Sequence, residues 1–161
     1  MASQQELYDH YCAVAAHVDT PIVLYNIPAR TGNKLLPETV CRLAKDVDFS
    51  VLSGNDSLIL PALKEGGVGG IAGCSNVYPM VLSSIYELFQ EGKLDEAQAA
   101  QDSIASFRAV FKYGNPNTVV KTAAMPGHNV GKCRAPFNQL PQEGLEALEK
   151  VLQENKDKGM C

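Results

Sequence analysis

The sequence contains neither a long hydrophobic run nor a concentration of positive charge. Its 161 residues include 14 Lys and Arg against 18 Asp and Glu, which gives a net charge of -4. A helix that spans a bilayer needs about 18 or more consecutive apolar residues, and a nucleic-acid surface needs clustered Lys and Arg. The sequence shows neither pattern, and residues 1–4 do not resemble the start of a signal peptide. We therefore expect one ordinary globular domain that binds neither membranes nor nucleic acids.

Disulfide and metal-binding motifs are absent as well. The cysteines are odd in number, lie far apart in the sequence and form no C-x-x-C pair: Cys12, Cys41, Cys74, Cys133 and Cys161. The three histidines, at positions 10, 17 and 128, do not have the spacing of metal ligands either. This pattern predicts free thiols in a reducing cytoplasm and argues against a disulfide framework or a zinc site.

One stretch, residues 21–32 with the sequence PIVLYNIPARTG, joins a short apolar run to a polar turn. The run is rich in β-branched residues and is broken by Pro28, so it predicts a buried strand that is too short for a helix. Tyr25, Asn26 and Arg30 follow its apolar part. In α/β proteins, polar side chains past the carboxyl end of a strand are where ligands bind. The alternative is an ordinary strand end with an exposed tyrosine and a surface arginine.

Strands and helices alternate along the rest of the chain. After the first strand, at 21–27, further short strands are predicted at 49–54 and 70–76, each ending in small or polar residues. Apolar side chains at helical spacing predict helices near 4–18, 37–44, 58–63, 80–89, 93–113, 119–125 and 145–153. This order predicts an α/β fold whose three strands are parallel, with Tyr25, Gly54 and Asn76 at the same end. Three strands cannot close a barrel, and a (β/α)8 barrel usually takes about 250 residues. Either part of the barrel is therefore missing or the sheet is a small open one.

These residues resemble the C-terminal part of the dihydrodipicolinate synthase / N-acetylneuraminate lyase family of class I aldolases. The most specific matches are YNIPARTG at 25–32, LSGND at 52–56, the glycine-rich segment 66–76 and CRAP at 133–136. The resemblance implies part of a (β/α)8 TIM barrel over residues 1–92, with one strand–helix unit missing. A helical extension follows over residues 93–161.

The resemblance also assigns roles to five residues. Tyr25 would be the catalytic phenol that shuttles a proton between the bound keto acid and the incoming carbonyl compound. Arg30 would bind the carboxylate of the second substrate through its planar guanidinium, as in the synthase branch of the family. Ile71 would line the pyruvate pocket with its backbone facing the substrate carboxylate, while Gly54 and Asn76 would shape the walls.

The implied reaction is the condensation of pyruvate with aspartate semialdehyde through a Schiff base, a step toward lysine biosynthesis. It needs no metal or organic cofactor, and the resemblance implies a cytoplasmic homo-oligomer. One alternative is the cleavage of a sugar keto acid, as by N-acetylneuraminate lyase or 2-keto-3-deoxygluconate aldolase. Another is a truncated half-barrel without catalytic activity.

The segment that carries the Schiff-base lysine in this family has no counterpart here. It resembles Gly-Ile-Lys-Asp and belongs between the predicted helix at 37–44 and the strand at 49–54, where residues 45–48 leave no room for it. The Gly-Thr-Thr-Gly-Glu-like loop of the first barrel half also has no counterpart. Such a lysine needs a dry, apolar setting, and no lysine lies on a predicted strand. Lys121 has apolar neighbours but lies on a helix outside the barrel, so we interpret it as a packing lysine.

Overall fold

The computed structural model describes residues 1–26, 28–47, 50–114, 118–125, 128, 130–137 and 139–160, and the side chains of Ala29 and Arg30 lie outside that description. The chain forms two compact units. The first unit comprises Met1–Leu52 and Gly66–Val68, and the second comprises Ser53–Glu65 and Gly69–Cys161. The division into a barrel part at 1–92 and an extension at 93–161 stays a prediction.

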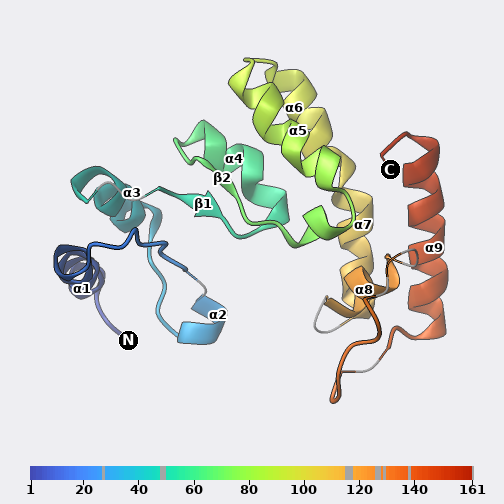
Figure 1. The fold of residues 1–161 in the computed structure, drawn as a ribbon, viewed down its shortest axis with the longest axis horizontal. Helices are drawn as coiled ribbons and strands as arrows, with labels where there is room; N and C mark the ends of the chain where they lie inside the picture. The colour runs from blue at the N-terminus through green and yellow to red at the C-terminus, as the bar shows by residue number, and fades with distance from the viewer. Residues whose placement is uncertain are drawn as a thin grey trace. The chain divides into compact units, whose positions relative to one another are not determined.

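The first unit contains the helices α1 (Gln4–His17), α2 (Pro28–Thr31) and α3 (Pro37–Asp46), shown in blue to teal in Figure 1. The Ser3-Gln4-Gln5-Glu6 spacing is that of a capping box, and the box is present at the start of α1. The Ser3 hydroxyl accepts a hydrogen bond from the Glu6 amide at 3.2 Å, and the Glu6 carboxylate accepts one from the Ser3 amide at 2.7 Å. These bonds satisfy two amide groups that have no partner inside the helix.

Polar side chains join α1 to α3. The Gln4 side-chain oxygen accepts hydrogen bonds from the Thr39 hydroxyl at 2.7 Å and from the Leu36 amide at 2.9 Å. One turn further along α1, the Tyr8 hydroxyl donates to Asp46 at 2.8 Å. No residue of α1 is buried. The contact between these helices therefore depends on hydrogen bonds more than on a hydrophobic core.

The strand predicted at 21–27 is not formed over residues 21–26, and Ile27 lies outside the described residues. An apolar run adopts a strand only where a neighbouring strand pairs with its amide and carbonyl groups. Within the described part of the first unit, no backbone hydrogen bond joins residues 21–26 to 50–52. In the apolar run, Val23 and Tyr25 are exposed, and Ile22 and Leu24 are half-buried.

The other two predicted strands are much shorter than expected. They pair as a two-stranded parallel sheet of β1 (Leu52–Ser53) and β2 (Gly69–Gly70). Hydrogen bonds of 2.8 Å run from the Val68 amide to the Val51 carbonyl and from the Ile71 amide to the Ser53 carbonyl. Residue 49 lies outside the described residues. The predicted strand 70–76 ends early because its second half coils into the 3-10 turn η2 (Gly73–Asn76).

The second unit is mainly helical. Its helices and turns are η1 (Asp56–Leu58), α4 (Ile59–Lys64), α5 (Pro79–Gln90), α6 (Leu94–Ser103), α7 (Ala105–Ala109), η3 (Val110–Tyr113), α8 (Thr118–Ala123) and α9 (Gln142–Asp157). The single helix predicted at 93–113 is interrupted at Ile104, where ψ is -6° and the chain turns between α6 and α7. The helix predicted at 145–153 extends further at both ends, because the apolar stripe that revealed it covers only its middle.

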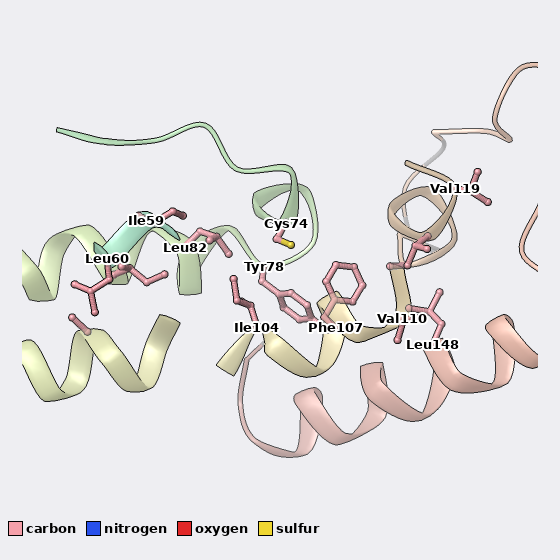
Figure 2. Close-up of a cluster of buried hydrophobic side chains, with 14 of the residues drawn as sticks. Ile59, Leu60, Cys74, Tyr78, Leu82, Ile104, Phe107, Val110, Val119 and Leu148 are labelled. Carbon is pink, nitrogen blue, oxygen red and sulfur yellow. The ribbon is translucent and has the colours of Figure 1, made fainter. Parts of the chain in front are cut away.

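A hydrophobic core fills the second unit (Figure 2). Tyr78 and Phe107 meet edge to face with ring centroids 5.2 Å apart, and Phe111 packs on Phe107 at 5.4 Å. The buried Asn155 of α9 donates a hydrogen bond to the Tyr78 hydroxyl at 3.0 Å. The core comprises Ile59, Leu60, Leu63, Cys74, Tyr78, Leu82, Ile85, Ala97, Ile104, Phe107, Val110, Val119, Val120, Ala124, Leu140 and Leu148.

No helix in the described part of the chain is long and apolar enough to cross a membrane. Among the same residues, no three or more His, Cys, Asp or Glu side chains gather in a way that would hold a metal ion.

Candidate functional site

Tyr25, the predicted catalytic residue, lies at the start of a loop that is pinned by its neighbour Asn26. The Asn26 side chain donates to the Leu35 carbonyl at 3.1 Å and accepts from the Leu35 amide at 3.2 Å. Leu35 is one of the few buried hydrophobic residues of the first unit. Asn26 therefore closes the loop that follows the apolar run, and the Tyr25 side chain beside it is 69% exposed.

The first unit has a cavity of about 350 Å³ beside this loop. Tyr25 and Thr31 contribute to its lining from the loop, and Glu6, His10 and Tyr11 contribute from α1. The lining is rich in hydroxyl and other hydrogen-bonding groups. The Tyr25 phenol is thus accessible to a small polar molecule within its own unit.

Arg30, the predicted carboxylate ligand, lies in the one-turn helix α2, and its side chain lies outside the described residues. The backbone after it forms a tight turn. The Thr31 hydroxyl donates to the Asn33 carbonyl at 2.9 Å, and Gly32 adopts a positive φ of 69° that residues with a side chain rarely accept. The predicted role of Arg30 is not tested by this geometry.

Gly54 and Ile71 lie at neighbouring strand ends in the second unit. Gly54 follows β1 and Ile71 follows β2, and because the two strands are parallel neighbours their carboxyl ends share one edge. Ile71 is 67% exposed, and its amide is already bonded to the Ser53 carbonyl. The structure therefore brings these two predicted site residues together, with the Ile71 amide used by the sheet.

Asn76, the third predicted wall residue, ends the η2 turn. Its side-chain amide donates to the Gly73 carbonyl at 3.0 Å, which braces the turn, and the residue is exposed. Asn55 caps the η1 turn, because its side-chain oxygen accepts from the Ser57 amide at 3.1 Å. Tyr25 and Arg30 belong to the other unit, so their placement at the same end as Gly54 and Asn76 stays a prediction.

A buried polar network around Asp56 was not predicted as part of the site. The Asp56 carboxylate accepts from the Cys74 amide at 3.0 Å and from the Arg108 guanidinium at 2.8 Å. Gln101 donates to the Asp56 carbonyl at 2.8 Å and accepts from the Leu60 amide at 3.0 Å. One sequence signal could have revealed it, because Gln101 and Arg108 lie seven residues apart on the apolar side of their predicted helix.

Cys74 lies in the same network and is fully buried. Burial raises the pKa of its thiol to about 12, with a further contribution from the negative charge of Asp56, while Arg108 and Lys121 act in the opposite direction. A thiol that stays protonated at neutral pH is a poor nucleophile. Cys74 therefore serves packing and not covalent chemistry.

Lys121 of α8 packs against the η2 turn. A Cβ placed on Gly73 would collide with the Lys121 amine, so in this arrangement the end of the lysine side chain lies directly against the glycine. The amine also lies 5.4 Å from the centre of the Phe111 ring, within reach of a cation–π contact. This placement agrees with the interpretation of Lys121 as a packing lysine.

Comparison with known proteins identifies the family. The sequence profile of the dihydrodipicolinate synthetase family matches residues 1–48 and 45–155, so the chain belongs to this family. The 4-hydroxy-tetrahydrodipicolinate synthase of Methanospirillum hungatei is 34% identical over 91% of this chain and 59% of its own length. The protein of the same name from Syntrophus aciditrophicus is 36% identical over 94% of this chain and 60% of its own length.

Solved structures give the same result for the fold. The 4-hydroxy-tetrahydrodipicolinate synthase of Methylacidiphilum fumariolicum superposes with a TM-score of 0.78 at 32% identity, covering 98% of this chain and 61% of that one. A dihydrodipicolinate synthase crystal structure gives 0.77 at 28% identity, with 99% and 63% coverage. The predicted fold class is confirmed as part of a (β/α)8 barrel followed by helices. The chain spans about 60% of the length of these relatives.

The alignments also support an internal gap. The alignment with the Methanospirillum protein spans 172 positions but covers 91% of 161 residues, roughly 147, which leaves about 25 positions without a residue of this chain. A strand–helix unit of a barrel averages about 30 residues. The two profile matches meet at residues 45–48, where the sequence analysis located the missing unit.

Proposed function

We propose that this chain belongs to a 4-hydroxy-tetrahydrodipicolinate synthase-like lyase. It carries the catalytic tyrosine, Tyr25, and the wall of the keto-acid pocket, formed by Gly54, Ile71 and Asn76 (the keto-acid wall). The proposed reaction condenses pyruvate with aspartate semialdehyde through a Schiff base, toward lysine biosynthesis. The observation that carries the proposal is the 34–36% identity, over more than 90% of the chain, to relatives of that name. No observation favours the sugar keto-acid alternative.

In the proposed reaction, each predicted residue keeps the role that the family resemblance gives it. Tyr25 transfers a proton between the bound keto acid and the incoming aldehyde, which its exposed phenol beside a polar cavity supports. Arg30 binds the carboxylate of aspartate semialdehyde through a bidentate contact. Gly54, Ile71 and Asn76 form the wall against pyruvate, and no metal or organic cofactor takes part.

The printed chain by itself should not turn over substrate, because no lysine is placed to form the Schiff base. The candidate with apolar neighbours, Lys121, lies on α8 with its amine against Gly73. Borohydride reduction in the presence of pyruvate, followed by intact mass measurement, tests this directly. We expect no adduct on the printed chain, and an adduct on a version that carries a lysine-bearing strand–helix unit inserted between residues 46 and 49. An adduct on Lys121 or another lysine of the printed chain would contradict the prediction.

The choice of aldehyde can be tested in that longer version with Arg30→Leu. Loss of a desolvated, bidentate carboxylate contact costs about 2–4 kcal/mol, so kcat/KM for aspartate semialdehyde should fall far more than pyruvate binding. Lys34→Leu, which removes an exposed cation from the same unit, is the matched control. An equal loss with a neutral aldehyde would assign Arg30 a structural role and favour a sugar keto-acid aldolase.

We further propose a homo-oligomer in a reducing cytoplasm. The exposed apolar side chains of the first unit, such as Val23 and Tyr25, support association with another copy. The free thiols Cys12, Cys41 and Cys133 support a reducing compartment. Light scattering coupled to gel filtration would measure the oligomeric state. A monomer at micromolar concentration would contradict the proposed homo-oligomer.

A further inference from the structure

Two turns of the second unit are held together by a single carboxylate. Asp56 follows the Gly54 turn at the end of β1, and its Oδ1 accepts from the amide of Cys74 at 3.0 Å, inside the η2 turn that follows β2. Because β1 and β2 are parallel neighbours, this bond crosses between the two chain segments that carry Gly54, Ile71 and Asn76.

The other oxygen of the same carboxylate is bound by a helix far along the chain. Arg108 of α7 donates to Oδ2 at 2.8 Å, and the side chains of Arg108 and Asp56 are 27% and 8% exposed. Gln101 of α6 holds the Asp56 backbone carbonyl at 2.8 Å. Both carboxylate oxygens and the carbonyl of Asp56 are therefore occupied, so its orientation is fixed from three directions.

A third side chain from this helical region reaches the η2 turn directly. Lys121 of α8 packs its amine against Gly73, one residue before the Cys74 amide that Asp56 binds. Arg108 and Lys121 thus touch the two turns at adjacent points, Arg108 through a charge-assisted hydrogen bond and Lys121 through its packed amine.

We infer that Asp56, held by Arg108, is a positioning residue that sets the keto-acid wall formed by Gly54 and residues 71–76. Helices α6 to α8 then act as an external brace for substrate binding. The identity of the ligand that this wall binds, pyruvate, rests on the proposed function. The positioning itself can be measured on the printed chain without any turnover.

The chemistry of the network defines the variant. Asp56→Asn keeps the shape of the side chain but replaces one acceptor oxygen with an NH2 group that faces a donor, either the Cys74 amide or Arg108. Arg108→Met removes the cation and leaves the carboxylate, whereas Arg108→Lys keeps a cationic donor. Asp102→Asn is the matched control, because Asp102 is an exposed aspartate of α6 whose carboxylate accepts from Gln98 on the same helix.

Amide hydrogen exchange of the printed chain provides the first measurement. We expect exchange of peptides covering residues 72–78 to be at least tenfold faster in Asp56→Asn and Arg108→Met, with less than a twofold change in Asp102→Asn. Peptides of α9, at 145–152, should change less than twofold in all variants. Unchanged exchange at 72–78, or an equal acceleration in α9, would overturn the inference by showing either no local role or only global destabilisation.

Sodium pyruvate provides the second measurement, which a merely structural role would not affect. In the longer version that carries the lysine-bearing unit between residues 46 and 49, pyruvate at millimolar concentration should slow exchange of residues 71–76. This effect should be lost in Asp56→Asn and Arg108→Met, and at least half of it should return in Arg108→Lys. Full retention in Asp56→Asn would overturn the positioning role. If pyruvate has no effect on the longer version, the proposed function fails, and the exchange comparison at 72–78 in the printed chain still decides whether Asp56 positions the turn.

Discussion

The two units of this chain are stabilised in different ways. In the first unit, the described buried hydrophobic residues are Leu35 and Leu43, and α1 buries no side chain at all. The second unit contains a continuous core of sixteen buried residues that reaches from α4 to α9 (Figure 2). Both units have helices of ordinary length, such as α1 with 14 residues and α9 with 16. The difference therefore lies in what those helices pack against.

This difference shows that secondary structure alone does not make a unit stable. Hydrogen bonds such as Thr39 to Gln4 and Tyr8 to Asp46 contribute about 0.5–1.5 kcal/mol each, while ordering one residue costs about 1–2 kcal/mol of backbone entropy. A handful of polar contacts cannot offset that cost over fifty residues. The first unit therefore depends on burial of its apolar run at residues 22–24, which a neighbouring barrel strand would provide.

The largest expected effect compares one leucine from each unit. Leu60 is 0% exposed in the core of the second unit, and Leu36 is 38% exposed in the first. Leu60→Ala should lower the free energy of unfolding by about 2–5 kcal/mol because it leaves a cavity, whereas Leu36→Ala should cost less than about 1 kcal/mol. Urea unfolding followed by circular dichroism measures both. Equal losses would show that the first unit has a core comparable to the second.

The alkylation rates of one cysteine from each unit provide a second comparison, which does not require a change to the fold. Cys74 is buried in the second unit with its pKa raised to about 12, and Cys41 of the first unit is exposed. At pH 8 the thiolate fraction of Cys74 is very small, so iodoacetamide should alkylate it at least about 100-fold more slowly than Cys41. Peptide mass spectrometry reads both sites in one sample. Similar rates would mean that the core of the second unit opens frequently.

Sequence reasoning succeeded where the signal is local. The Ser3 capping box, the Asn55 N-cap and the helices were predictable because their determinants lie within a few residues of one another. The strand at 21–27 was wrong over its described residues, because a strand also requires a partner whose presence the local pattern cannot reveal. The family was recognisable because residues 25–32 form a specific motif.

The polar network of the candidate site illustrates the opposite limit. Asp56 and Arg108 are 52 residues apart, and Asp56 and Gln101 are 45 apart. Each looks ordinary in its own segment, an aspartate in a turn and two polar residues on a helix. Only tertiary packing shows that they share one buried contact. The missing lysine, in contrast, was visible in the sequence because the whole strand–helix unit that carries it is absent.

The smallest expected effect concerns the polar contact between α1 and α3 and its dependence on pH. The Tyr8 hydroxyl donates to Asp46 at 2.8 Å, and this bond, with a weaker contribution from Cys12, raises the pKa of Tyr8 from 10.0 to about 12. The neutral phenol is favoured in the folded unit, so the stability that this contact contributes should be fully present below pH 10 and be lost as the pH rises from 10 through 12. Because both groups are exposed and screened by solvent, the effect on overall stability should be small.

Tyrosinate absorbance at 295 nm measures this titration, with the difference between the unmodified chain and Tyr8→Phe isolating Tyr8 from the other five tyrosines. We expect the difference curve to have its midpoint near pH 12, and Asp46→Asn to move the midpoint back toward 10, because the bond to the carboxylate is the main cause of the shift. The capping box of α1 does not involve Tyr8, so the helix content should stay unchanged in both variants. A midpoint near 10 in the unmodified chain would show that the hydrogen bond is not maintained in solution, and that the first unit lacks even this polar contact between its helices.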